Sequence, residues 1–192
     1  MTPTTRENFV KTYSPFINLV TKDTGILAGT LIAQAILESS GKYNLAGAWL
    51  VGGSKLSQVA NNFFGIKAGK SWKGERYNIA TGENKPSGEY YIVNDDFRRY
   101  DSVEDSIKDY VKFLKENPRY EKAGVFKAKT VKEQADALKK AGYATAPNYA
   151  EMVESVYKSI KGFISENLGT IKKSGTGLAL LVGLFIAYKY FK

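Results

Sequence analysis

The stretch from Gly25 to Gly41, GILAGTLIAQAILESSG, constrains the fold of this chain more than any other segment. Its apolar residues recur three and four positions apart, which is the spacing of one helix face and predicts a largely buried helix. These residues are Leu27, Leu31, Ile32, Ala35 and Ile36. We expect Thr24 to cap the start of this helix and Gly41 to end it.

Glu38 is the one acidic residue in this stretch, and the spacing places it on or beside the apolar face, in the last helical turn. Burial and the carbonyl end of the helix dipole both disfavour the charged carboxylate, so we expect the pKa of Glu38 to be raised. A raised pKa is what a general acid needs near neutral pH. The alternative is an ordinary helix-end residue that faces solvent or pairs with a lysine.

The composition excludes several catalytic mechanisms and metal sites, because the 192 residues include no Cys and no His. Thiol nucleophiles, the Ser-His-Asp relay and the usual zinc sites all need side chains that this chain lacks. We therefore expect neither a metal nor a cofactor. Among reactions that run on carboxylates alone, glycoside hydrolysis is the most familiar.

The chain is basic, with 28 Lys and Arg residues against 19 acidic ones and a formal net charge of +9. This balance favours polyanionic partners, such as nucleic acid, anionic lipid or the acidic polymers of a bacterial envelope. The basic residues are scattered and no nucleic-acid motif accompanies them, so we expect no nucleic-acid partner. A solvated surface is the alternative.

The pattern along the chain predicts an α+β fold, mostly helical with a small β-hairpin lobe. We expect a first helix capped by Thr4 or Thr5 and broken near Pro15. We expect residues 39–53 to be irregular. We expect a β-hairpin over residues 71–100, because this stretch is rich in Tyr, Ile, Val and Phe and has turn signals at residues 81–82 and 86–88. Further helices are predicted over residues 102–117, 130–141 and 150–163. A substrate groove can form between two such lobes.

Four motifs together resemble the glycoside hydrolase family 73 domain, the peptidoglycan β-N-acetylglucosaminidase domain of autolysins, flagellar-rod hydrolases and phage lytic enzymes. In chain order they are AQAILESSG, SKLSQVANNFFGIK, FRRYDSVEDSIKDYVKFLKENPRY and AGYATAPNYA. The resemblance spans about residues 9–160. It implies a lysozyme-like fold and cleavage of the β-1,4 bond after N-acetylglucosamine in glycan strands of peptidoglycan.

The resemblance also implies site residues. Glu38 takes the place of the family's catalytic glutamate, and Glu83 that of a second carboxylate on the hairpin, with Glu89 as the first substitute. Tyr143 corresponds to the tyrosine of the family's AGYAT motif, which positions the acetamido group or a water. Substrate-binding positions of the family correspond to Asn61, Phe64, Trp72 and Tyr149.

Two departures from the family pattern concern this site. The family often has an aromatic residue shortly after the catalytic glutamate, as in ESGWG, whereas this chain reads ESSGKYNL. The hairpin motif also differs, since Glu83 is followed by NKPSG rather than by tyrosine and an Asn-Gly turn. Two other functions stay open. The chain could be a muramidase or lytic transglycosylase, which cuts the other bond of the repeat, or a wall-binding protein without catalytic activity.

The C-terminal tail carries fifteen residues without a charge, SGTGLALLVGLFIAY, between Lys173 and Lys189. As a helix it covers about 22 Å, against a hydrocarbon core of roughly 30 Å. Snorkelling lysines and the terminal aromatic residues can make up the difference. We expect three parts: a glucosaminidase domain over residues 1–163, a polar linker over 164–173 and a transmembrane anchor over 174–192. A core helix is the alternative for the last part.

The first residues, MTPTTRENF, do not read as a secretory signal. A membrane-anchored wall hydrolase without an export signal suggests a virion membrane, and a bacterial cell envelope is the alternative location.

Overall fold

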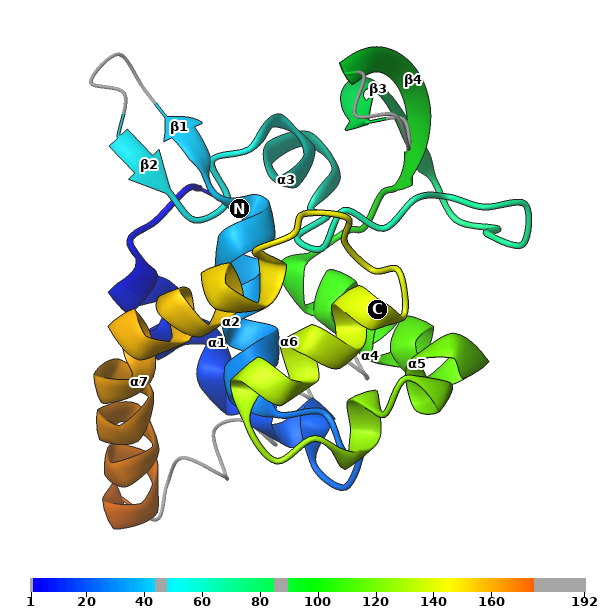
Figure 1. Ribbon diagram of the computed structural model, residues 1–192. Coiled ribbons are helices and arrows are strands. Elements are labelled where there is room, and N and C mark those ends of the chain that lie inside the picture. Colours follow the sequence, from blue (N-terminus) through cyan, green and yellow to red (C-terminus); the bar gives the residue numbers. More distant parts are fainter. Residues whose placement is uncertain (1, 44–47, 85–89, 175–192) are drawn as a thin grey trace. The chain divides into compact units, whose positions relative to one another are not determined.

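The computed structural model describes residues 2–43, 48–84 and 90–174 (Figure 1). The chain divides into two compact units. The first consists of Met1–Thr4 and Ala35–Phe113, and the second of Thr5–Gln34 and Leu114–Lys192. Helices α2 (Ala28–Ser39) and α4 (Val103–Glu116) each contribute residues to both units.

The second unit is helical. Helix α7 packs on α1 and on α6 (Figure 1). The short helix η1 packs on α5 and α6. The bounds are α1 Arg6–Thr21, α5 Pro118–Lys122, η1 Val125–Lys127, α6 Val131–Lys140 and α7 Tyr149–Ser174. Large apolar side chains from each of these helices are buried, among them Phe9, Ile17, Tyr120, Val125, Leu138 and Ile160.

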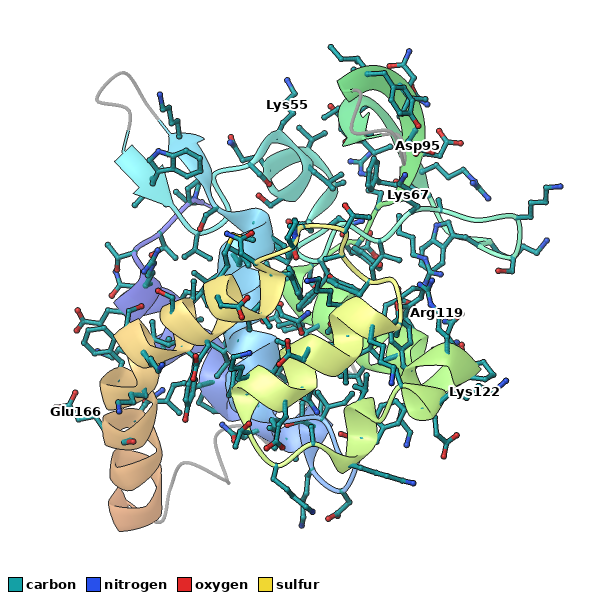
Figure 2. The ribbon with its side chains drawn as sticks, viewed as in Figure 1. Lys55, Lys67, Asp95, Arg119, Lys122 and Glu166 are labelled. Atoms are coloured by element: carbon teal, nitrogen blue, oxygen red, sulfur yellow. The ribbon has the colours of Figure 1, made fainter. Side chains whose placement is uncertain are left out.

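In its described residues, the first unit contains two separate antiparallel pairs of strands and the short helix α3, together with the end of α2 and most of α4. The bounds are β1 Gly41–Tyr43, β2 Ala48–Leu50, α3 Lys55–Ala60, β3 Arg76–Asn84 and β4 Tyr90–Arg98. The predicted hairpin lobe is thus confirmed as β3–β4. Lys67 and Asp95 form an ion pair of 2.6 Å at this hairpin, where Figure 2 shows them next to each other.

Helix α1 runs without a break through Pro15, so the predicted break is wrong. Proline has no N–H to donate to the carbonyl of Lys11 four residues earlier. The side-chain amide of Asn167 on α7 supplies the missing donor, at 3.1 Å from the Lys11 oxygen and 3.3 Å from the Val10 oxygen. Thr5 caps the helix as expected, because its hydroxyl accepts from the Asn8 amide.

The predicted cap at Thr24 is also wrong, because α2 begins only at Ala28. The Thr24 hydroxyl instead accepts from the Ile26 amide within the preceding turn. Gln134 on α6 holds the segment directly before α2: its side-chain oxygen accepts from the Leu27 backbone amide at 2.9 Å and its side-chain nitrogen donates to the Gly25 carbonyl at 3.0 Å.

Two expectations for the strands fail. Residues 81–82, read as a turn, lie inside β3, where Thr81 pairs with Val93 and Gly82 with Ile92. Residues 39–53, read as irregular, contain the β1–β2 pair. Strand pairing, rather than local residue preference, determines both stretches.

The helices after residue 100 agree better with those predicted from the sequence. Ser102 caps α4 and accepts from the Asp105 amide at 3.1 Å, and Thr130 caps α6 in the same way. Helix α7, predicted to end at Phe163, continues to Ser174, so the predicted linker over residues 164–173 is helical.

No helix within the described residues has the length and apolarity to cross a membrane. Almost all of the predicted anchor, from residue 175 on, lies outside the described residues.

The base of the β3–β4 hairpin is fastened by Arg98, the last residue of β4. Its guanidinium donates to the Asp109 carboxylate on α4 at 2.7 Å, and the Tyr100 hydroxyl donates to the same oxygen at 2.7 Å. The Arg98 and Asp109 side chains are each only 14% exposed. Burial, and then the bond to Asp109, raise the pKa of Tyr100, so its hydroxyl stays a donor.

We therefore expect Asp109→Ala to lower the free energy of unfolding by about 3 kcal/mol, because it leaves a largely buried guanidinium without its partner. Urea denaturation of the two proteins measures the difference. Asp136→Ala is the matched control: Asp136 pairs with Lys132 in an exposed bridge, and its loss should cost less than about 1 kcal/mol. Equal losses in the two variants would contradict this account of the hairpin base.

Candidate active site

Glu38 is the penultimate residue of α2, in the last turn as expected, and its side chain is half-buried. The described structure therefore agrees with the predicted position of Glu38. Its role as a general acid stays a prediction.

Ser39 holds the helix end on which Glu38 sits, and it is fully buried. Its hydroxyl donates to the Ala35 carbonyl at 2.5 Å and accepts from the Gly52 amide at 3.1 Å. Its carbonyl accepts from the Ser54 amide at 2.9 Å and from the Ser57 hydroxyl at 3.3 Å. One residue thus joins the end of α2 to the segment that leads into α3.

The backbone around this junction is packed too closely for larger residues. A Cβ atom on Gly41 would come within 2.7 Å of the Gly53 carbonyl carbon, and one on Gly53 within 2.4 Å of the Gly41 oxygen. Val51 exchanges backbone hydrogen bonds with Thr4 at 2.9 and 3.0 Å. The chain after Glu38 therefore has little freedom to move relative to the helix end.

Two predicted binding residues, Asn61 and Phe64, have internal partners. Asn61 ends α3 in the left-handed conformation, φ 48°, and its amide donates to the carbonyls of Tyr100 and Asp101 at 3.0 and 3.2 Å. Phe64 is 2% exposed and stacks on Tyr110, with ring centroids 4.1 Å apart. In this structure Phe64 supports the first unit from its core, and substrate binding by either residue stays a prediction.

Trp72 packs against the base of the hairpin. Its indole N–H donates to the Glu75 carbonyl at 2.9 Å, and the Arg98 guanidinium lies 4.6 Å from the ring centroid. A Cβ atom on Gly74 would come within 2.5 Å of the indole, which explains the glycine there. One face of Trp72 is thus occupied by Arg98, and its predicted contact with substrate is untested.

Glu83 lies in β3, where its backbone pairs with Tyr91 of β4. Its side chain and the whole of the alternative residue, Glu89, are outside the described part of the structure. The second carboxylate therefore stays a prediction placed on the hairpin, in the same unit as Glu38.

Tyr143 and Tyr149 belong to the second unit, with ring centroids 6.0 Å apart. The Tyr143 amide donates to the Leu138 carbonyl across Gly142, whose φ of 77° turns the chain at the end of α6. Tyr149 is 2% exposed, and its hydroxyl accepts from the Gln34 side chain at 2.7 Å. Their predicted roles toward substrate are likewise untested.

Sequence reasoning missed the structural importance of Asn62, which is 1% exposed. Its amide nitrogen donates to the Ile66 and Arg98 carbonyls at 3.0 and 2.9 Å, and its oxygen accepts from the Ile66 amide at 3.1 Å. Asn62 thereby ties the turn after α3 to the hairpin base. The only signal was a polar pair, Asn61-Asn62, directly before two phenylalanines, and that pattern does not show which amide is buried.

Among the residues that the structure describes, no group of three or more acidic side chains is arranged to hold a metal ion.

A family described as mannosyl-glycoprotein endo-beta-N-acetylglucosaminidase matches residues 14–162 of the chain. Among curated relatives, the peptidoglycan hydrolase FlgJ of Salmonella typhimurium is 36% identical over 156 residues, which cover 81% of this chain and 46% of that protein. The exo-glucosaminidase LytG of Bacillus subtilis is 30% identical over 151 residues, or 77% of this chain and 49% of that protein. The chain thus spans about half the length of these relatives.

Among solved structures, a peptidoglycan hydrolase mutant from Sphingomonas sp. A1 is similar with a TM-score of 0.66 and 30% sequence identity. The similarity covers 83% of this chain and 99% of that one. These findings confirm the predicted α+β, mostly helical fold of the lysozyme-like glycoside hydrolases.

The anchoring of the helix end by Ser39 leads to a prediction. Ser39→Ala removes the acceptor of a buried amide, so we expect the free energy of unfolding to fall by about 2 kcal/mol. The Gly52 amide should also exchange its hydrogen faster. Denaturation and hydrogen exchange measure the two effects.

Ser40→Ala is the matched control, because the half-buried Ser40 hydroxyl donates only to the Ile36 carbonyl within the same helix end. Its loss should leave the exchange of Gly52 unchanged. Unchanged Gly52 exchange in Ser39→Ala would show that Ser39 does not hold the helix end.

Proposed function

The chain belongs to the glucosaminidase family of glycoside hydrolases, and from this membership we propose that it is a peptidoglycan hydrolase that cleaves the β-1,4 bond after N-acetylglucosamine. The match over residues 14–162 carries this proposal, because it includes Glu38 and nearly all of the described fold. The names of the relatives, FlgJ and the Sphingomonas protein, support peptidoglycan as the substrate.

In the proposed mechanism, the Glu38 carboxylic acid protonates the departing glycosidic oxygen while positive charge develops at the anomeric carbon. Glu38 lies in the last turn of α2, one residue before the buried Ser39. The anchoring by Ser39 keeps the acid in one place during the transfer, which contributes to orientation.

A second group must act on the opposite side of the sugar ring, and we propose that Glu83 does so. A carboxyl separation of about 5 Å would favour a covalent retaining route, and one of about 6.5 to 9.5 Å an inverting water. In a substrate-assisted route, the N-acetyl group of the sugar is the nucleophile and Tyr143 positions it.

Digestion of purified cell walls tests the bond and the acid together. We expect the full chain to release fragments with N-acetylglucosamine at their reducing ends, measured by mass spectrometry. N-acetylmuramic or anhydro ends would instead show a muramidase or a lytic transglycosylase. Release of single sugars would show an exo-acting enzyme, the activity named for LytG.

Glu38→Gln should lower the rate of this digestion at least about a hundredfold, because the amide has no acidic proton to transfer. Its melting temperature should stay close to that of the wild type. Glu116→Gln is the matched control, since Glu116 is an exposed glutamate at the end of α4. An undiminished rate in Glu38→Gln would remove Glu38 from the mechanism.

We also propose that residues 174–192 insert into a membrane and tether the enzyme, in a virion membrane or a bacterial cell envelope. The support is the run of fifteen uncharged residues between Lys173 and Lys189, followed by Tyr190 and Phe191.

Carbonate extraction of membranes tests the tether. The full chain should stay in the membrane fraction, whereas a chain that ends at Ile171 should be released. Leu184→Lys places a charge near the middle of the run at a cost of about 3 kcal/mol, and it should release the full-length protein at least in part. Equal release of the full and shortened chains would exclude the tether.

A further inference from the structure

The β1–β2 pair carries an exposed tryptophan close to Glu38 in the chain. Trp49 on β2 is 69% exposed, whereas the second of the two tryptophans in the sequence, Trp72, is half-buried against Arg98. A large aromatic side chain in water leaves much apolar area without a partner. Trp49 therefore has an indole surface available for a ligand.

Lys42 lies directly opposite Trp49 in the strand register, and its side chain is also exposed. Residues opposite each other in an antiparallel pair project to the same face, with Cβ atoms about 5 Å apart. One face of this small ribbon thus presents an aromatic ring beside an ammonium group.

The ribbon begins only three residues after Glu38, at Gly41, and belongs to the same compact unit. Four residues of extended chain span at most about 14 Å, which limits the separation of Lys42 from Glu38. The base of the ribbon is held by the close Gly41–Gly53 approach and by the Val51–Thr4 hydrogen bonds. The chain length thus keeps the Cα atom of Lys42, and with it the paired Trp49 backbone, in the neighbourhood of Glu38.

The two side chains match the chemistry of one ligand. The negative face of an indole attracts the C–H groups on the apolar face of a sugar ring, and a lysine attracts carboxylates. A peptidoglycan strand offers both, because its amino sugars carry lactyl and peptide carboxylates. Two arguments thus favour a binding site on the ribbon: its side chains match the chemistry of the glycan strand, and it lies only three residues after Glu38 in the chain.

We propose that Trp49 and Lys42 form a subsite that binds the glycan strand beside the catalytic acid, with a sugar ring on the indole and a carboxylate on the ammonium group. This inference rests on the proposed function. It also accounts for the missing aromatic residue after Glu38, because the ribbon supplies an aromatic ring eleven positions later.

Binding is measured on the full chain carrying Glu38→Gln, so that hydrolysis does not remove the ligand. The probes are soluble peptidoglycan fragments that retain their peptides and uncharged β-1,4-linked N-acetylglucosamine oligomers. Tryptophan fluorescence with acrylamide as quencher is compared with and without Trp49→Ala, so that the difference reports on Trp49 and not on Trp72, the other tryptophan of the chain. We expect both probes to protect Trp49 from the quencher.

Substitutions separate the two contributions. Trp49→Ala, followed by calorimetry, should weaken binding of both probes about tenfold, and Trp49→Tyr should restore most of it. Lys42→Ala should weaken only the charged fragments, and raised salt should abolish its effect. Leu19→Ala removes an exposed apolar side chain on α1 and should change neither affinity.

The outcomes distinguish failure of the proposed subsite from failure of the proposed enzymatic function. If the wild type digests cell walls but Trp49→Ala binds both probes as tightly as the parent, the subsite is wrong and the proposed function stands. If Trp49 responds to phosphatidylglycerol vesicles and to neither glycan probe, the ribbon contacts membranes and the subsite is overturned. If the wild type neither digests walls nor binds the probes, the proposed function fails together with the subsite.

Discussion

The first unit depends on the hydrogen bonds that converge on Ser39 at the end of α2. A helix end leaves carbonyl groups without partners, and a buried end must satisfy them with other donors. Here the carbonyl and the hydroxyl of Ser39 connect the helix to the segment around Gly52 and Ser57, and the same junction begins the β1–β2 ribbon. The proposed acid, Glu38, sits one residue away, so the interactions that stabilise the unit also hold the proposed catalytic group.

The hairpin is fastened by a second set of buried polar contacts. The Arg98 and Asp109 side chains pair at 2.7 Å with little exposure to solvent, and the Asn62 side-chain amide donates to the Arg98 backbone carbonyl. A partly buried ion pair has few alternative partners, so it specifies where the strands leave the core. The predicted second carboxylate, Glu83, lies on this hairpin, so the Arg98–Asp109 pair holds the base of the element that carries it.

The two elements proposed to carry catalytic carboxylates, the end of α2 and the β3–β4 hairpin, are thus each held at one end by buried or partly buried polar contacts. Phe64, which the family resemblance marks for binding, stacks on Tyr110 in the core, and Trp72, marked likewise, has Arg98 over its ring. Substrate binding by either residue stays a prediction. In the described part of this unit, the exposed aromatic side chains include Trp49 on β2, which is 69% exposed, and Tyr91 on β4, which is 40% exposed. Trp49 lies on a ribbon that the sequence pattern did not predict.

The sequence by itself determined what depends on neighbours along the chain: the family, the position of Glu38 in a last helical turn, and the helices whose periodicity and caps are local, such as the one capped by Ser102. Tertiary structure alone decided the features that need a distant partner. Helix α1 passes Pro15 because Asn167, 156 residues after Lys11, supplies the absent donor. Gln134, 107 residues after Leu27, binds the amide directly before α2, which begins at Ala28. Local residue preferences cannot predict such hydrogen bonds, because the groups that satisfy the backbone become neighbours only when the chain is folded.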